Sequence, residues 1–89
     1  LVKEDETPLL GKVYQYRGIN LENQKKYDDT IAAYKKSRDY YLQANPAQAA
    51  QRLLDIGNIY RNDFSNYPTA LEYYDQAAAE LKKLNQSEA

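Results

Sequence analysis

The stretch LLDIGNIYRNDFSNYPTALEYYDQA, residues 53–77, largely determines the fold that the sequence predicts. Apolar side chains recur three and four positions apart on both sides of the short polar turn DFSN. This spacing is typical of amphipathic helices, whose period is about 3.6 residues. Pro68 fits the first turn of the second helix, because its missing N–H would have no intrahelical partner there. The stretch therefore predicts two helices joined by a tight turn.

An earlier part of the chain repeats this helix–turn–helix pattern. Gly18 lies 39 residues before Gly57, and Tyr34 lies 40 residues before Tyr74. The difference of one residue falls in the turn, where insertions usually enter. The same periodicity predicts four helices, at roughly residues 8–24, 27–43, 46–62 and 67–84. The predicted N-cap residues are Thr7, Asn45 and Asn66.

The repeated unit resembles the tetratricopeptide repeat, whose pattern is W-x₂-L-G-x₂-Y, then A-x₃-F, then P. The residues that carry the resemblance are Tyr14, Gly18, Leu21, Tyr27 and Tyr34 in the first repeat, and Leu53, Gly57, Tyr60, Tyr67, Ala70, Tyr74 and Ala77 in the second. Arg17 and Thr30 depart from the pattern, and both repeats lack the closing proline. The period of about 40 residues exceeds the usual 34 and resembles the long, kinesin-light-chain-like variety.

The resemblance implies an all-α fold, an α-solenoid of two repeats whose four antiparallel helices form a fragment of a right-handed superhelix. We expect an N-terminal lead-in at 1–7, repeats at 8–45 and 46–85, and a C-terminal tail at 86–89. Because such arrays generally need at least three repeats, we expect either an excised piece of a longer protein or a chain that self-associates. A compact four-helix bundle that holds a small ligand is the weaker alternative.

Glycine inside a helix costs about 1 kcal/mol relative to alanine, so Gly18 and Gly57 predict close approach by the partner helix. Large tyrosines should fill the space around these contacts, with their hydroxyls reaching water. Seven of the ten tyrosines are assigned to packing positions: Tyr14, Tyr27, Tyr34, Tyr41, Tyr60, Tyr67 and Tyr74. The other three are candidate partner contacts: Tyr16, Tyr40 and Tyr73.

In tetratricopeptide proteins the first helix of each repeat lines a concave groove, so the resemblance places a binding surface there. The candidate residues are Lys12, Gln15, Ile19, Glu22 and Asn23 in the first repeat, and Gln51, Leu54, Asn58, Arg61 and Asn62 in the second. Asn58 and Asn62 lie one turn apart and can each donate to and accept from an extended peptide. The plain alternative is that these polar residues are ordinary solvated positions, and that Ile19 and Leu54 pack against a neighbouring repeat.

The composition argues against catalysis. The chain of 89 residues contains no His and no Cys, so the commonest general base and the thiolate nucleophile are both missing. We expect no cofactor and no metal site. The basic residues within 25–38 alternate with acidic ones, which indicates a solvated helix face. A net charge of −1 gives no electrostatic case for binding nucleic acid or an anionic membrane.

These observations predict a non-catalytic module, cytoplasmic in location, that binds a protein or peptide through the concave face of its repeats. The alternative is a structural scaffold that forms homo-oligomers through exposed repeat faces and has no peptide groove.

Overall fold

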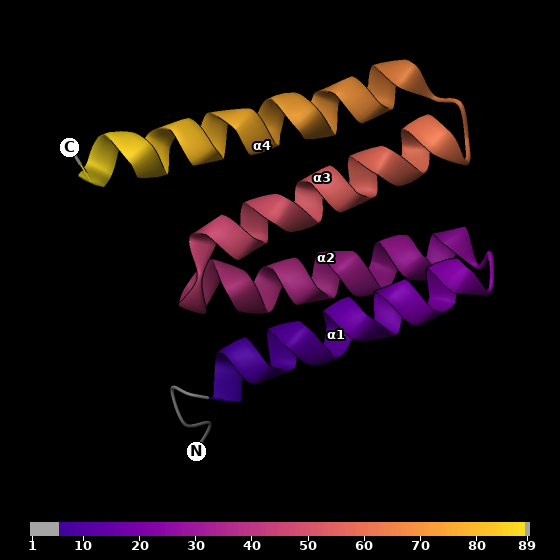
Figure 1. Ribbon diagram of the computed structural model, residues 1–89, viewed down its shortest axis with the longest axis horizontal. Coiled ribbons are helices and arrows are strands. Elements are labelled where there is room, and N and C mark those ends of the chain that lie inside the picture. Colours follow the sequence, from indigo (N-terminus) through magenta and orange to yellow (C-terminus); the bar gives the residue numbers. More distant parts are fainter. Residues whose placement is uncertain (1–5, 89) are drawn as a thin grey trace.

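The computed structural model describes residues 6–88 and shows four helices, each antiparallel to the next (Figure 1). They are α1 (Glu6–Asn23), α2 (Tyr27–Ala44), α3 (Pro46–Asn62) and α4 (Tyr67–Glu88). Within the described residues, extensive contacts join only helices that are consecutive in sequence. The predicted all-α array of two helical hairpins is therefore confirmed. The alternative of a compact four-helix bundle was wrong, because α1 and α4 do not pack together.

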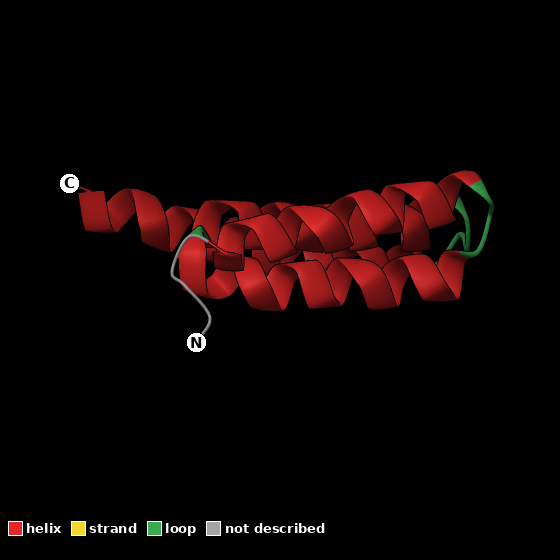
Figure 2. Cartoon of the chain, turned by 90° about the horizontal axis from the view of Figure 1, so that it is seen from below, coloured by secondary structure: helices red, strands yellow, loops and turns green. Residues whose placement is uncertain are grey.

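The array is a thin slab, with Cα extents of 36 × 32 × 14 Å. Figure 2 shows the slab edge-on, with the α1–α2 and α3–α4 turns at one end and the α2–α3 connection at the other. A slab this thin leaves every helix accessible on part of its surface. The handedness of a longer superhelix stays a prediction, since two hairpins span only a short part of one turn.

Asparagine side chains begin α3 and α4, as the sequence predicted. Asn45 Oδ1 accepts from the backbone N–H of Gln48 at 3.3 Å, and Asn66 Oδ1 accepts from that of Thr69 at 3.3 Å. These bonds satisfy amide groups of the first turn that have no intrahelical partner. The polar turn residues thus determine where the second hairpin starts and where its chain reverses.

The ends of the helical array differ from the prediction. Thr7 lies inside α1, so it is not the N-cap, and residues 1–5 of the expected lead-in lie outside the described residues. At the other end α4 runs to Glu88, well into the segment expected to be a tail. Helix ends are weakly encoded, because polar residues such as those after residue 84 are compatible with either helix or coil.

Tyrosine rings from the second helix of each hairpin pack against glycines of the first helix. A Cβ atom placed on Gly18 would lie 2.6 Å from Cε1 of Tyr34, and one on Gly57 would lie 2.7 Å from Cε1 of Tyr74. No side chain larger than hydrogen fits at such distances unless the ring moves. The predicted close approach at both glycines is therefore confirmed.

A third contact of this kind extends the packing along α1. Gly11 lies two helical turns before Gly18, and Tyr41 lies the same seven residues after Tyr34, so the antiparallel register is preserved. A Cβ atom on Gly11 would lie 3.0 Å from the ring of Tyr41. The prediction missed Gly11, although its spacing from Gly18 matches the spacing of the two tyrosines.

The main apolar cluster lies between α2 and α3 and joins the two hairpins. It contains Ile31, Tyr34, Ile56 and Ile59, with Tyr27, Tyr60 and Tyr73 packed against it. Tyr67 was expected to pack as Tyr27 does, but it is 63% exposed, so that prediction was wrong. Tyr67 lies on the outer side of α4, where no further helix of the described part of the chain covers it.

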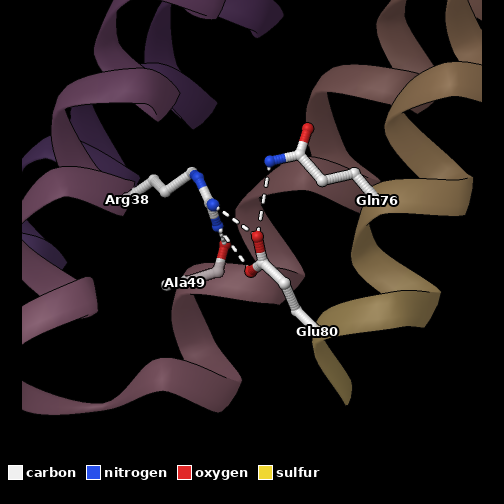
Figure 3. A network of polar contacts seen from close by, with 4 residues as sticks. All are labelled: Arg38, Ala49, Gln76 and Glu80. Carbon is white, nitrogen blue, oxygen red and sulfur yellow. Dashed lines mark hydrogen bonds and ion pairs between the residues drawn. The ribbon is translucent and has the colours of Figure 1, made fainter. Parts of the chain in front are cut away.

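A polar network ties α2, α3 and α4 together (Figure 3). Arg38 donates from Nη1 to the carbonyl oxygen of Ala49 at 3.0 Å, and its two terminal nitrogens bind the Glu80 carboxylate at 3.0 and 2.6 Å. Gln76 adds a bond to Glu80 at 3.3 Å. The Arg38 side chain is only 13% exposed. Its assignment to a solvated face of residues 25–38 was therefore wrong, because its partner lies 42 positions along the chain.

We expect Glu80→Gln to lower the melting temperature by about 5 °C at neutral pH, because the neutral amide loses charge-assisted hydrogen bonds. The hydrogen bond from Arg38 holds the pKa of Glu80 below its usual value of 4.5. A carboxylate whose pKa is lower in the folded state stabilises the fold above its unfolded pKa, and this stabilisation is lost as the pH falls through the folded pKa.

The difference between wild type and Glu80→Gln should therefore stay constant from about pH 8 to pH 5.5 and shrink below about pH 4.5. Thermal melts followed by circular dichroism across this range measure it. Glu72→Gln, at an exposed position on the same helix, is the matched control for the loss of one negative charge. A difference that persists unchanged at the lowest pH would contradict the role given to the Glu80 carboxylate.

Candidate protein-binding surface

A groove of about 430 Å³ lies where α1, the end of α2 and the start of α3 meet. We call it the α1–α3 groove, and its lining residues are Pro8, Lys12, Gln15, Tyr16, Tyr41, Asn45 and Gln48. Lys12 and Gln15 were predicted for a binding surface on the first helices, and the structure brings these two together. Tyr16 was predicted only as an unassigned aromatic contact, and it is 62% exposed at the groove.

Gln48 was missed because it belongs to the first turn of α3, whereas the prediction concentrated on the later turns of that helix. Its backbone N–H is held by Asn45, which also lines the groove. The predicted N-cap at Asn45 was the signal that could have indicated Gln48. Because Asn45 alone connects α2 to α3, the first turn of α3 must lie beside the end of α2.

Three predicted binding residues accept hydrogen bonds from tyrosine hydroxyls. The pairs are Tyr41 with Gln15 at 2.9 Å, Tyr34 with Glu22 at 3.0 Å, and Tyr74 with Asn58. In each pair the ring crosses a glycine of the first helix, and its hydroxyl reaches a polar side chain of that helix. The expectation that the hydroxyls of Tyr34 and Tyr74 reach water did not include these side-chain acceptors. Gln15, Glu22 and Asn58 therefore position tyrosines, whatever else they bind.

Burial keeps the hydroxyls of Tyr34 and Tyr41 protonated, so both remain hydrogen-bond donors. Burial raises the pKa of Tyr34, and its bond to Glu22 raises it further. Burial also raises the pKa of Tyr41, in part offset by the positive charge of Arg52. Both hydroxyls consequently stay protonated at physiological pH, and Tyr41 presents a neutral aromatic floor to the groove.

A buried positive charge lies behind this floor. The Arg52 side chain is 6% exposed, with Cζ 5.7 Å from the centroid of the Tyr41 ring. Its Nε lies 2.9 Å from the Asp55 carboxylate, but without the alignment of a hydrogen bond, and Nη1 finds no acceptor among the described residues. Burial raises the pKa of Asp55, and Arg52 opposes that effect. The Asp55 carboxylate balances the charge of Arg52, so Lys12 is the one cation among the described residues that line the groove.

The remaining predicted residues do not line the groove. Five of them are exposed along α1 and α3: Ile19, Asn23, Gln51, Arg61 and Asn62. Leu54 is half-buried. Asn58 is exposed, and its oxygen already accepts one hydrogen bond from Tyr74, so a partner would share that oxygen with the tyrosine. The expected pairing of Asn58 and Asn62 toward one extended peptide stays a prediction.

Two further aromatic candidates contribute to packing. Tyr40 stacks on Tyr14 with ring centroids 5.7 Å apart, and Tyr73 stacks on Tyr60 at 5.5 Å. Tyr40 and Tyr73 are half-buried and each gives one ring face to its stack, whereas Tyr16 is exposed, so Tyr16 is the best placed of the three tyrosines that the repeat pattern left unassigned.

Among residues 6–88 no three acidic side chains come together in the way that a metal ion requires. None of the helices in this described range has the length and apolar character that crossing a bilayer demands.

The fold and this surface together define a helical-repeat array with a polar groove between the first helices of its two hairpins. Over residues 12–89 the chain matches the family model of the soluble NSF attachment proteins, SNAP. This match covers most of the chain, so the chain belongs to the SNAP family, a helical-repeat family of non-enzymatic protein-interaction adaptors. No curated protein and no solved structure matched the chain.

The family match supports the coarser part of the resemblance. It supports a helical-repeat fold and a general role in binding proteins. It does not point specifically to the kinesin-light-chain-like variety of the tetratricopeptide repeat.

Proposed function

We propose that this chain is a non-catalytic binding module of a SNAP-type adaptor and that it holds a partner protein in the α1–α3 groove. The family is named for attaching NSF, and its members bind SNARE complexes. Either could therefore be the partner of this chain. The proposal keeps the finer features predicted from the sequence, namely tetratricopeptide-like repeats and a partner segment that lies along the first helices.

The observation that carries this proposal is the chemistry of the groove. Lys12, Gln15 and Gln48 offer charged and amide groups around the exposed ring of Tyr16. An exposed tyrosine surrounded by polar groups is a common anchor in protein interfaces. Amide side chains can donate to and accept from a partner backbone, and Lys12 can bind a carboxylate. The groove therefore suits a protein segment that carries acidic side chains.

Binding of the purified chain to NSF and to a SNARE complex, measured by isothermal titration calorimetry, tests this proposal. We expect the double variant Lys12→Glu/Tyr16→Ala to weaken binding at least about tenfold, since it reverses a charge and removes the aromatic anchor. Lys35→Glu, at an exposed position on α2, is the matched charge control and should bind as wild type does.

Asn62→Ala tests whether the surface extends along α3. Asn58→Ala is unsuitable for this purpose, because it also removes the acceptor of Tyr74. Circular dichroism confirms that each variant is folded. The proposal fails if the wild-type chain binds neither partner, or if Lys12→Glu/Tyr16→Ala binds as tightly as Lys35→Glu.

A further inference from the structure

The polar side chains of the α1–α3 groove do not supply hydrogen-bond donors and acceptors equally. None of the described residues that line the groove is acidic. Lys12 carries three N–H donors on its ammonium group and no acceptor. Gln15 and Asn45 each have an amide oxygen and an amide nitrogen, and hydrogen bonds within the chain already engage the oxygen of both. The groups that remain for a partner are therefore mainly donors.

Tyr41 determines how the amide of Gln15 is oriented. The Tyr41 hydroxyl donates to Gln15 Oε1 at 2.9 Å, so this oxygen is turned toward the tyrosine. Burial raises the pKa of Tyr41, so the hydroxyl keeps the proton that it donates. The ring is 4% exposed and packs against Gly11, which holds the hydroxyl in place. A partner that donates to Oε1 would share it with Tyr41, whereas a partner that accepts from Nε2 would not.

The start of α3 orients the amide of Asn45 in the same sense. Asn45 Oδ1 accepts from the backbone N–H of Gln48 at 3.3 Å. If the amide turned over, this N–H would lose its acceptor and would face the amide N–H groups instead. Asn45 is exposed, so a partner can reach the amide nitrogen. The N-cap of α3 thus gives the groove a second amide whose free hydrogen-bonding groups are mainly donors.

A carboxylate is the chemical group that matches this set of donors. Its two oxygens accept about four hydrogen bonds, and it has no donor of its own. A carboxamide of the same shape has one oxygen and two N–H groups. In the groove its N–H groups would face those of Gln15 and Asn45. The side chains of Tyr16 and Gln48 can each donate or accept, so they do not distinguish the two groups.

We infer that the α1–α3 groove selects a glutamate or aspartate side chain of its partner through the N–H donors of Lys12, Gln15 and Asn45. Tyr41 is a positioning residue for this selection, because it acts through Gln15. The direction of the hydrogen bonds contributes to the selection as well as the charge of Lys12. The selection rests on the proposed function, since it takes place in the same groove.

Two probes of nearly equal shape test the selection: the methylamides of N-acetyl-glutamate and N-acetyl-glutamine. Their dissociation constants are measured by NMR titration, with the backbone N–H of Gln48 as a reporter in the groove. The wild-type chain should bind the glutamate probe about tenfold more tightly than the glutamine probe. Tyr41→Phe keeps the ring and should lower this ratio about threefold, because the Gln15 amide can then turn and offer its oxygen.

Tyr34→Phe is the matched control for Tyr41→Phe. It also removes a buried tyrosine hydroxyl, but the acceptor of that hydroxyl is Glu22, which does not line the groove. The ratio of the two dissociation constants should therefore equal that of the wild type. A general loosening of the helix packing would change both variants alike.

Two further variants separate hydrogen-bond direction from charge and from stability. Lys12→Gln removes the cation but keeps the donors of Gln15 and Asn45, so the glutamate probe should still bind about twofold more tightly. Asn45→Asp keeps an oxygen that caps α3 and places a negative charge at the helix N-terminus, so the fold should be at least as stable. It replaces the donors with an acceptor, however, and should make the glutamate probe the weaker ligand.

Thermal melts followed by circular dichroism confirm that each variant is folded. Equal binding of the two probes by the wild type, an unchanged ratio in Tyr41→Phe, or loss of all preference in Lys12→Gln would each overturn the selection. If the chain binds NSF or a SNARE complex but binds both probes alike, the selection is wrong and the proposed function stands. If the chain distinguishes the probes but binds neither protein, the proposed function is wrong and the selection stands.

Discussion

Gly18→Leu should destabilise the fold by about 3 kcal/mol or more, a large part of the stability of so small a chain. A single Cβ atom at this position would already lie 2.6 Å from the Tyr34 ring, and leucine adds three further carbons. The ring is 3% exposed and its hydroxyl is bonded to Glu22, so it cannot move aside without losing both its packing and its hydrogen bond. Urea unfolding followed by circular dichroism measures the loss as a lower midpoint.

Gly18→Ala is the informative control for this prediction. Alanine favours a helix over glycine by about 1 kcal/mol, so the substitution stabilises a helix whose glycine faces open space. At Gly18 the clash with Tyr34 should outweigh this gain. Gly57→Ala should be milder, because the Tyr74 ring that it meets is only half-buried. If Gly18→Ala increased the stability, the Tyr34 ring would have moved aside at little cost. That result would contradict the explanation that close packing requires glycine at this position.

Ile56→Ala should cost about 3–4 kcal/mol, because the side chain is completely buried in the cluster that joins the two hairpins. Truncation leaves a cavity between α2 and α3, where the neighbouring Ile59 is itself buried. Since the cluster lies in the interface that joins the two hairpins, we also expect the unfolding transition to broaden as they uncouple. Differential scanning calorimetry measures both effects.

Two substitutions calibrate this result. Ile56→Val removes one carbon and should cost about 1 kcal/mol. Ile19→Ala removes an apolar side chain that is 38% exposed and should change stability by no more than about 0.5 kcal/mol. If Ile56→Ala costs no more than Ile19→Ala, the cluster between the hairpins is not the main source of stability.

The features that the sequence predicted correctly are those with local signals. Helical periodicity, the two asparagine caps and the glycine–tyrosine spacing each depend on residues within a single hairpin. Thr30, which departs from the repeat pattern, also has a local explanation. It is fully buried, and its hydroxyl donates to the carbonyl oxygen of Lys26, the N-cap residue of its own helix, at 2.8 Å. A threonine can therefore replace the usual alanine without an unsatisfied polar group.

The features that could not be predicted depend on contacts between hairpins or between distant positions. Ser37 is buried because it donates to the carbonyl oxygen of Gly11 at 2.7 Å, 26 positions away. The α1–α3 groove needs side chains from both hairpins, so the pattern within one repeat indicates only part of it. Exposure was also misjudged for Tyr67, because no helix among residues 6–88 packs on its side of α4.

The bond from Arg38 to Glu80 has a consequence for how the array comes apart. In a linear array each helix usually contacts only its neighbours, so the last helix can fray without disturbing the rest. Here α4 packs on α3, and its Glu80 also forms hydrogen bonds with Arg38 of α2, two helices earlier in the chain. Opening of α4 therefore leaves Arg38, which belongs to the first hairpin, without its carboxylate partner. Hydrogen exchange near the C-terminal end of α4 is consequently coupled to the stability of α2, a helix of the other hairpin.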